Sequence, residues 1–136
     1  MHFDFDSVVD FPPLGDDRDS LVALEANKTI PFEIKHVYYL FNTEGRVTRG
    51  LHAHKALKQV MLCISGSYKV TLDDGRSRES ISLSSRTKGL LIEGLIWREM
   101  CDFSADCALL VIASELYDEN DYVRNYLDFE GLIGNA

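Results

Sequence analysis

The sequence predicts an all-β domain, a sandwich or a barrel, that ends in one short helix. Short segments rich in β-branched and aromatic residues recur at intervals of about ten residues, which is typical of such folds. Turn residues separate these segments, and the run DDGR, Asp73 to Arg76, predicts a hairpin turn with a solvated charge cluster. The chain has 136 residues, the length of one globular domain, so we expect a single domain over residues 1–136.

The predicted elements can be placed in order along the chain. We expect strands over residues 20–25, 34–42, 58–64, 67–72, 79–84, 89–93, 97–103 and 107–114. Residues 117–132 differ from these, because acidic side chains come first and Tyr122, Tyr126 and Phe129 follow at helical spacing. This segment predicts the terminal helix.

Composition and charge exclude several classes of protein. A formal net charge of -8 argues against a nucleic-acid partner, which requires a clustered basic face, although a small anionic ligand needs only one or two arginines. The chain has neither a long apolar run nor a basic, apolar N-terminus, so we expect a cytoplasmic protein with no membrane partner. Its three cysteines form no CxxC pair and are interpreted as buried thiols.

Two histidines stand one residue apart in the segment RGLHAH, residues 49–54. On a strand, His52 and His54 point to the same face, while Ala53 points to the other. One buried histidine is usually structural, but two imidazoles on one inner face must each find a partner, and sites that tolerate this are usually functional. The pair therefore indicates either metal binding or proton transfer.

The spacing around the pair resembles the first motif of the cupin superfamily, HxH-x4-E-x6-G, with Gln59 in the glutamate position and Gly66 at its end. In metal-binding cupins a third histidine comes from a later strand, and here Arg98, within IWREM, aligns with it. An amide is a poor ligand and a guanidinium has no lone pair to give. We therefore expect no metal and no other cofactor, which disfavours a metal-dependent cupin oxygenase. Proton transfer by the two imidazoles is the remaining chemistry.

A longer set of segments is similar to one cupin family, the dTDP-sugar 3,4-ketoisomerases. RGLHAHK, GLLIEGLIWREM and SELYDENDYVRNY have that family's order and spacing, and the resemblance covers nearly the whole chain. Many relatives have WHEM where this chain has WREM. The resemblance implies a cupin jelly-roll barrel, no metal, and a homodimer that exchanges N-terminal strands. It also implies a dTDP-4-keto-6-deoxyglucose substrate, used in making deoxyamino sugars such as those of lipopolysaccharide O-antigen.

The resemblance also implies the catalytic residues. A ketone at C4 acidifies the hydrogen on C3, so one group can remove that proton and another can protonate C4, which leaves the ketone at C3. We expect His52 to act as the base at C3 and His54 to serve C4, although the sequence alone allows the opposite assignment. The product could have either the gluco or the galacto configuration, with a weak preference for galacto.

Several residues near the pair are candidates for substrate binding. Arg49 would face away from His52 in an unbroken strand, and only a bulge near Gly50 would turn it inward. Tyr38 and Tyr39 face opposite sides, so at most one lines the site.

The remaining candidates depend on the later strands. Trp97 could stack on thymine, although a lone tryptophan is more often part of a core. Arg98, or an arginine of the partner subunit, could bind the diphosphate, and Gln59 is also expected to contact the substrate.

Two other functions remain open. The first is a dTDP-4-keto-sugar epimerase, which pairs a histidine with an aspartate and uses a tyrosine as acid; this sequence offers no obvious tyrosine for that role. The second is a non-catalytic sugar-nucleotide-binding cupin, against which the intact histidine pair argues.

Overall fold

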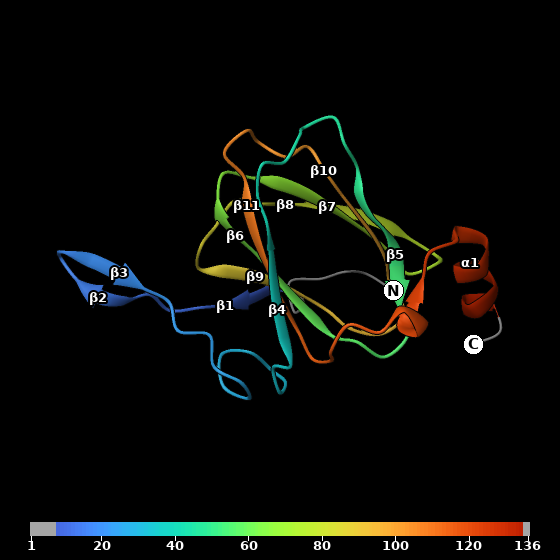
Figure 1. The fold of residues 1–136 in the computed structure, drawn as a ribbon, viewed down its shortest axis with the longest axis horizontal. Coiled ribbons are helices and arrows are strands. Elements are labelled where there is room, and N and C mark those ends of the chain that lie inside the picture. Colours follow the sequence, from blue (N-terminus) through green and yellow to red (C-terminus); the bar gives the residue numbers. More distant parts are fainter. Residues whose placement is uncertain (1–7, 135–136) are drawn as a thin grey trace.

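The computed structural model describes residues 8–134. Its main body consists of two antiparallel five-stranded sheets that face each other (Figure 1). Sheet one contains, in spatial order, β1 (Val8–Asp10), β9 (Lys88–Ile92), β6 (Gln59–Ser65), β11 (Ala108–Ala113) and β4 (His36–Leu40). Sheet two contains β12 (Tyr122–Val123), β5 (Arg49–His54), β10 (Trp97–Cys101), β7 (Tyr68–Asp73) and β8 (Arg78–Leu83). From β5 onward the chain passes repeatedly between the sheets, which gives the all-β cupin barrel that the sequence predicts.

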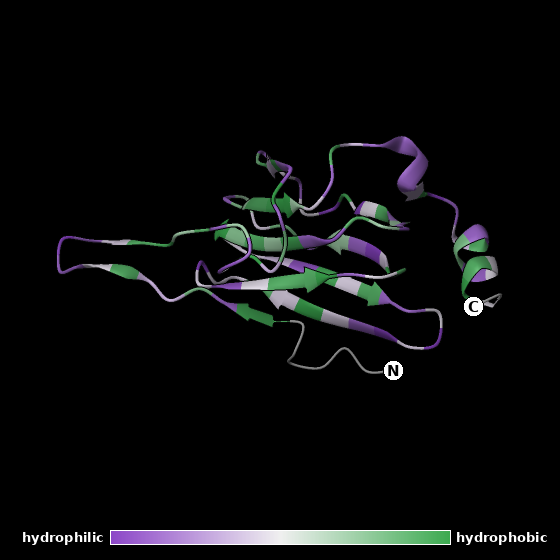
Figure 2. Cartoon of the chain, turned by 90° about the horizontal axis from the view of Figure 1, so that it is seen from below, coloured by the Kyte–Doolittle hydropathy of each residue, from purple (hydrophilic) through white to green (hydrophobic). Residues whose placement is uncertain are grey.

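The main core lies between the two sheets. Strands β7 and β8 of sheet two alternate apolar and polar residues, whereas β6 and β11 of sheet one are apolar on both faces. The inward side chains of both sheets form one buried cluster that includes Met61, Val70, Leu90, Met100 and Val111. Figure 2 shows bands of hydrophobic residues, in green, along the strands. Two of the three cysteines, Cys63 and Cys107, are buried in the same cluster as free thiols, as predicted.

Smaller clusters cover the outer faces of the sheets. On sheet one, Phe11, Ile30 and Phe32 pack against outward residues of β6 and β11. On sheet two, Ala53, Trp97 and Val123 pack beneath Phe129 of the C-terminal helix α1 (Tyr126–Gly134). Sheet two therefore lies between this outer cluster and the inward-pointing side chains of β5 and β10.

A hairpin of β2 (Leu14–Asp16) and β3 (Asp19–Leu21) projects away from the barrel (Figure 1). All six of its strand residues are exposed, including Leu14 and Leu21. The sequence predicted a strand over residues 20–25 and missed β2, because the exposed side chains of this hairpin have no alternation that marks a buried face.

The predicted terminal helix was too long. Residues 117–132 begin with a 3-10 turn, η2 (Glu119–Asp121), followed by β12, and α1 begins only at Tyr126. The backbone groups of Tyr122 and Val123 pair with β5, so these two residues cannot form part of a helix. The Asn125 side chain then accepts hydrogen bonds from the N–H groups of Leu127 and Asp128 and caps the helix.

The hairpin turn after β7 was predicted correctly, and Arg76 is exposed as expected, but the two carboxylates of the turn are buried. Asp74 accepts the N–H groups of Arg76 and Ser77, and Asp73 accepts that of Gly75. No helix among residues 8–134 is long and apolar enough to cross a membrane.

Candidate active site

His52 and His54 lie on the inner face of β5. Ala53 between them packs into the outer cluster under α1, so its neighbours must point between the sheets. Their ring centroids are 4.8 Å apart and the ring planes are nearly perpendicular, at 85°. The two imidazoles therefore face the same space between the sheets.

A β-bulge in β5 changes which of its residues point between the two sheets. Arg98 pairs with His52 and Glu99 with Gly50, so the pairing skips Leu51, and Gly50 and Leu51 both have positive φ, 86° and 55°. A side chain at Gly50 would also approach the carbonyl oxygen of Arg98 to 3.1 Å, which explains the glycine.

The bulge changes the orientation of Arg49. Arg49 now pairs with Met100, an inward residue of the core, and therefore lies on the same face as His52. Its exposed side chain lines a pocket of about 240 Å³ together with Leu40, Val47 and Phe103.

Both imidazoles donate their Nδ1 hydrogens to fixed acceptors. The Nδ1 of His52 lies 2.9 Å from the carbonyl oxygen of Gly50, and the Nδ1 of His54 lies 3.1 Å from Oδ2 of Asp121. Because a carbonyl or a carboxylate only accepts, each neutral ring carries its hydrogen on Nδ1 and a lone pair on Nε2. The Nε2 of His54 is buried without a hydrogen-bond partner in the described part of the chain.

Burial keeps both imidazoles neutral. It lowers the pKa of His52 to about 4, and the Arg98 guanidinium contributes in the same direction. The pKa of His54 is also lowered, first by burial and then by the charges of Arg98 and His52. At neutral pH the contact between His54 and Asp121 is therefore a hydrogen bond from a neutral ring rather than an ion pair.

Arg98 brings a buried cation to the pair. It is 0% exposed, and its guanidinium donates to Oε1 of Gln59 (2.6 Å) and to the carbonyl of Ile96 (2.8 Å). Its Nε has no partner and no carboxylate lies within ion-pair distance, as far as residues 8–134 are concerned. Burial lowers the pKa of Arg98 to about 10, so the group stays charged at neutral pH.

The hydrogen bond from Arg98 to Gln59 continues to Tyr38 on the opposite sheet. Nε2 of Gln59 donates to the Tyr38 hydroxyl at 3.2 Å, so hydrogen bonds connect β10 of one sheet with β6 and β4 of the other. Burial raises the pKa of Tyr38, which therefore stays protonated. Tyr38 is the member of the Tyr38–Tyr39 pair that faces inward.

Two residues of the site were missed from the sequence. The ring of Tyr122 lies 4.9 Å from that of His52 and 4.3 Å from that of His54, and Asp121 bonds to His54. Both lie within residues 117–132, which were predicted to be helical, so only the pairing of β12 with β5 could have revealed them. We call the following seven residues the inner polar cluster: Tyr38, His52, His54, Gln59, Arg98, Asp121 and Tyr122.

The donor set of this cluster does not fit a cupin metal. Gln59 and Arg98 occupy the two ligand positions beyond the histidines, and they hydrogen-bond to each other. A guanidinium cannot ligate, and the residues that the structure describes include no group of three His, Cys, Asp or Glu side chains suited to an ion.

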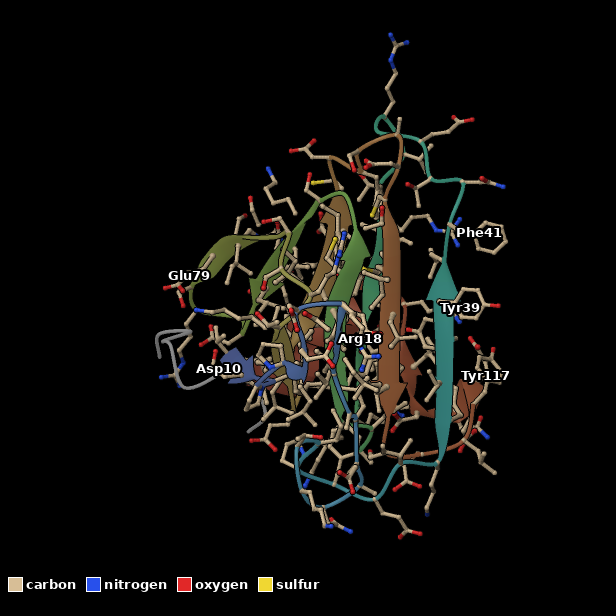
Figure 3. The ribbon with its side chains drawn as sticks, turned by 90° about the vertical axis from the view of Figure 1, so that its left-hand side faces the viewer. Asp10, Arg18, Tyr39, Phe41, Glu79 and Tyr117 are labelled. Carbon is tan, nitrogen blue, oxygen red and sulfur yellow. The ribbon has the colours of Figure 1, made fainter. Side chains whose placement is uncertain are left out.

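Tyr39 and Trp97 lie away from the cluster. Tyr39 is 67% exposed on the outer face of β4, where it points outward beside Phe41 (Figure 3). Trp97 is 4% exposed and packs against Tyr126 and Phe129 beneath α1, on the side of sheet two that faces away from the histidines. This placement contradicts the expected stacking of Trp97 on a base bound at the pair, because Trp97 and Arg98 alternate across the sheet.

Comparison with known proteins identifies the family of the chain. Residues 5–133 match the family described as FdtA, WxcM-like, C-terminal. A curated relative from Aneurinibacillus thermoaerophilus, TDP-4-oxo-6-deoxy-alpha-D-glucose-3,4-oxoisomerase, is 51% identical over 126 residues, 93% of this chain and 91% of the relative.

Two solved structures extend the comparison. A 3,4-ketoisomerase from Helicobacter canadensis matches with a TM-score of 0.91 and 45% identity over 93% of this chain and 96% of that one. A sugar 3,4-ketoisomerase from Thermoanaerobacterium thermosaccharolyticum in complex with TDP matches with a TM-score of 0.91 and 41% identity, over 94% and 93% of the two chains. The chain belongs to the FdtA, WxcM-like C-terminal family and is an isomerase of the sugar 3,4-ketoisomerase type.

Proposed function

We propose that this protein converts dTDP-4-keto-6-deoxyglucose into a dTDP-3-keto-6-deoxyhexose, with His52 and His54 as the catalytic residues. The observation that carries the proposal is the pair of neutral imidazoles, 4.8 Å apart, whose Nδ1 atoms are both engaged and whose Nε2 atoms are left to react. The identity of 51% to an oxoisomerase acting on that sugar supports the choice of substrate.

The reaction needs only proton transfers. One imidazole removes the hydrogen from C3, the electrons of that C–H bond form a C3–C4 double bond, and O4 takes up a proton. The resulting enediol then loses the hydroxyl proton from O3, C4 gains a proton from the second group, and the carbonyl is at C3. No oxidant enters or leaves.

The enediol step develops negative charge on oxygen, which requires a donor. Arg98 suits this role, because its buried charge is close enough to lower the pKa of both imidazoles and has unused donor capacity at Nε. We propose that Arg98 binds the reacting oxygens, while Arg49, at the open pocket, binds the diphosphate. Gln59 and Tyr38 hold the guanidinium in place.

The direct test is proton NMR of dTDP-4-keto-6-deoxyglucose incubated with the protein. Migration of the carbonyl from C4 to C3 is the expected result. A sugar that keeps its carbonyl at C4 while one ring carbon inverts would identify an epimerase, and an unchanged sugar would identify a binding protein. Either outcome would overturn the ketoisomerase proposal.

An epimerase is the second candidate function, and one structural observation favours it. His54 is paired with Asp121, and Tyr122 lies beside both imidazoles, so the histidine–aspartate pair and the tyrosine that epimerases use are both present. The identity to an oxoisomerase favours the first candidate.

We further propose that two copies form a homodimer by exchanging their N-terminal strands. The hairpin β2–β3 extends into solvent with Leu14 and Leu21 exposed at 56% and 55%, and the outer face of β4 exposes Tyr39 and Phe41 (Figures 1 and 3). Such apolar surfaces are usually covered by a partner.

Light scattering on dilute protein tests the dimer and should give twice the chain mass. The double variant Leu14→Glu, Leu21→Glu should shift the protein towards monomer. A wild-type protein that is fully active as a monomer would contradict the exchange. The compartment is proposed to be the cytoplasm, and the product a precursor of deoxyamino sugars such as those of O-antigen.

A further inference from the structure

The ring of Tyr122 contacts both histidines and an exposed arginine. Its centroid lies 4.9 Å from that of His52 and 4.3 Å from that of His54, and both contacts are inclined rather than stacked. The guanidinium carbon of Arg124 lies over the same ring, 4.2 Å from its centroid. A single aromatic ring therefore connects the histidine pair to a surface cation.

Arg124 is itself held in place by Glu119. Its Nε and Nη2 donate to the two carboxylate oxygens of Glu119 at 2.6 Å and 2.9 Å, and the hydroxyl of Tyr117 donates to the same carboxylate. The ring of Tyr117 also lies 5.5 Å from that of Tyr122. We call Tyr117, Glu119 and Arg124 the surface clamp, because each of them is more than half exposed.

The surface clamp is not what holds β12 on the sheet. The backbone of Tyr122 pairs with β5, and the carbonyl of Asp121 accepts the N–H of Lys55 at 3.1 Å. An exposed ion pair also adds little to stability. A guanidinium fixed by two parallel hydrogen bonds does, however, attract the face of an aromatic ring. The clamp therefore restricts the side chain of Tyr122 rather than its backbone.

The hydroxyl of Tyr122 has no comparable contacts. Among residues 8–134 it makes no hydrogen bond, whereas the ring packs on two imidazoles and one guanidinium. Proton transfer from an imidazole requires its nitrogen to point at the reacting carbon, and a small misplacement of a catalytic group is costly. A ring packed on both imidazoles limits how far either can turn.

We propose that Tyr122 is a positioning residue that fixes the planes of both imidazoles through its ring, and that Arg124 and Glu119 hold this ring in place. The kinetic part of the inference rests on the proposed ketoisomerase function, but the packing of the rings does not. The role differs from that of the tyrosine acid of an epimerase, which would act through its hydroxyl.

Three variants separate the ring, the hydroxyl and the clamp. Tyr122→Phe removes only the hydroxyl, and Tyr122→Leu removes the ring. Arg124→Met removes the cation and leaves the ring in the chain, so it tests the proposal even if Tyr122→Leu folds poorly.

Arg78 provides a matched control for Arg124. It forms an ion pair with Asp73 at 3.0 Å, and its guanidinium carbon lies 5.7 Å from the ring centroid of Tyr126, which packs on Trp97 beneath α1. Arg78→Met therefore removes an arginine of the same type away from the histidines. Because Asp73 is buried, this variant should lose more stability than Arg124→Met, so kcat is compared per folded molecule.

The first readout is proton NMR of the two imidazoles without substrate. Their signals are assigned by the loss of each in His52→Asn and His54→Asn. An aromatic ring 4.3–4.9 Å away shifts these signals by its ring current. Tyr122→Leu should therefore move the signals of both imidazoles, and Arg124→Met should move them in the same direction. Tyr122→Phe and Arg78→Met should leave them in place.

The second readout is turnover of dTDP-4-keto-6-deoxyglucose. Tyr122→Leu should lower kcat by about 30-fold or more and Arg124→Met by about tenfold, because the imidazoles are misaligned. In both variants KM should change by less than about threefold. Tyr122→Phe and Arg78→Met should keep kcat within about threefold of the wild type.

The outcomes separate the two claims. Unchanged imidazole signals in Arg124→Met, or equal losses of kcat in Arg124→Met and Arg78→Met, would overturn the role of the clamp. A loss in Tyr122→Phe as large as that in Tyr122→Leu would show that the hydroxyl acts instead of the ring. A wild-type protein without turnover would refute the ketoisomerase proposal, and the NMR signals would still decide whether Arg124 holds Tyr122 on the imidazoles.

Discussion

The two faces of strands β5 and β10 differ in composition and in how well their polar groups are satisfied. The inner face presents His52, His54 and Arg98, and among the described residues Nε2 of His54 and Nε of Arg98 have no hydrogen-bond partner. The outer face presents Ala53 and Trp97 beneath α1, and the Trp97 indole donates to Glu99 at 2.9 Å.

This difference suggests a division of roles between adjacent residues. Unsatisfied buried polar atoms cost stability, and a protein tolerates them where a ligand will use them. An apolar cluster under a capped helix adds stability and leaves no group free to react. Variants of the two faces should therefore fail in different ways.

The largest expected effect is on the outer face. Phe129 is 0% exposed under sheet two, so Phe129→Ala should lower the free energy of unfolding by about 3–5 kcal/mol. Leu127, 75% exposed on the same helix, is the control, and Leu127→Ala should change it by less than about 0.5 kcal/mol. Denaturant titration measures both. Equal losses would mean that α1 does not bury a core.

On the inner face, His52→Asn and His54→Asn should each lower kcat by about 100-fold or more, or about 2.7 kcal/mol of transition-state stabilisation. The folded state should be retained, as judged by circular dichroism. His36 on β4 serves as the control for the loss of one imidazole: it hydrogen-bonds to the carbonyl of Glu115 and its ring stacks on that of Tyr38, and it does not belong to the histidine pair. His36→Asn should lower kcat by less than about tenfold. Near-normal turnover in both variants would show that His52 and His54 have a structural role only.

Arg98→Met should separate the two properties most clearly. Replacing a buried cation by an apolar side chain of similar size should leave the free energy of unfolding within about 1 kcal/mol, because the lost desolvation cost offsets the lost bonds. Turnover should fall about tenfold or more, because the enediolate loses its donor. A variant that unfolds but is fully active per folded molecule would show that Arg98 is structural.

The smallest expected effect is on the pH dependence of kcat/KM. Since the pKa of His52 is lowered to about 4 and that of His54 is also lowered, both rings keep their lone pairs down to mildly acidic pH. The profile should be flat from about pH 8 to about pH 5 and should fall below that. A fall already centred near pH 6.5 would mean that the imidazoles titrate as if solvated.

The same shifts make stability depend on pH in the opposite direction from a histidine whose pKa is raised by an ion pair. The unfolded chain takes up protons on these histidines near their ordinary pKa of 6.5, whereas the folded chain does not until the pH reaches about 4. Stability should therefore decrease as the pH falls from about 6.5 towards 4, and His52→Asn should reduce this slope.

The sequence predicted the elements whose burial is regular. The alternation in β7 and β8 follows from one buried face, the continuous apolar runs of β6 and β11 follow from burial on both faces, and the spacing of His52 and His54 placed them on a common side. The bulge at Gly50 was foreseen as the condition that turns Arg49 inward, because glycine permits the positive φ.

The missed parts depend on contacts between distant segments. Asp121 and Tyr122 belong to the site only because β12 pairs with the end of β5, and local helical spacing in Tyr122 and Tyr126 suggested a different structure. Trp97 was expected at the ligand because no local signal tells which of two neighbours, Trp97 or Arg98, faces the barrel interior; the apolar residue lies beneath the helix.

In the proposed mechanism two imidazoles that exchange with water transfer the protons, and deuterium labelling is the most direct test. The reaction is run in heavy water with dTDP-4-keto-6-deoxyglucose, and fresh product is examined by proton NMR. We expect a 3-keto product with deuterium at C4, because the proton delivered there comes from an exchangeable group. A 3-keto product that retains hydrogen at C4 would show a shielded transfer from C3 to C4 by a single residue and would contradict the two-histidine mechanism.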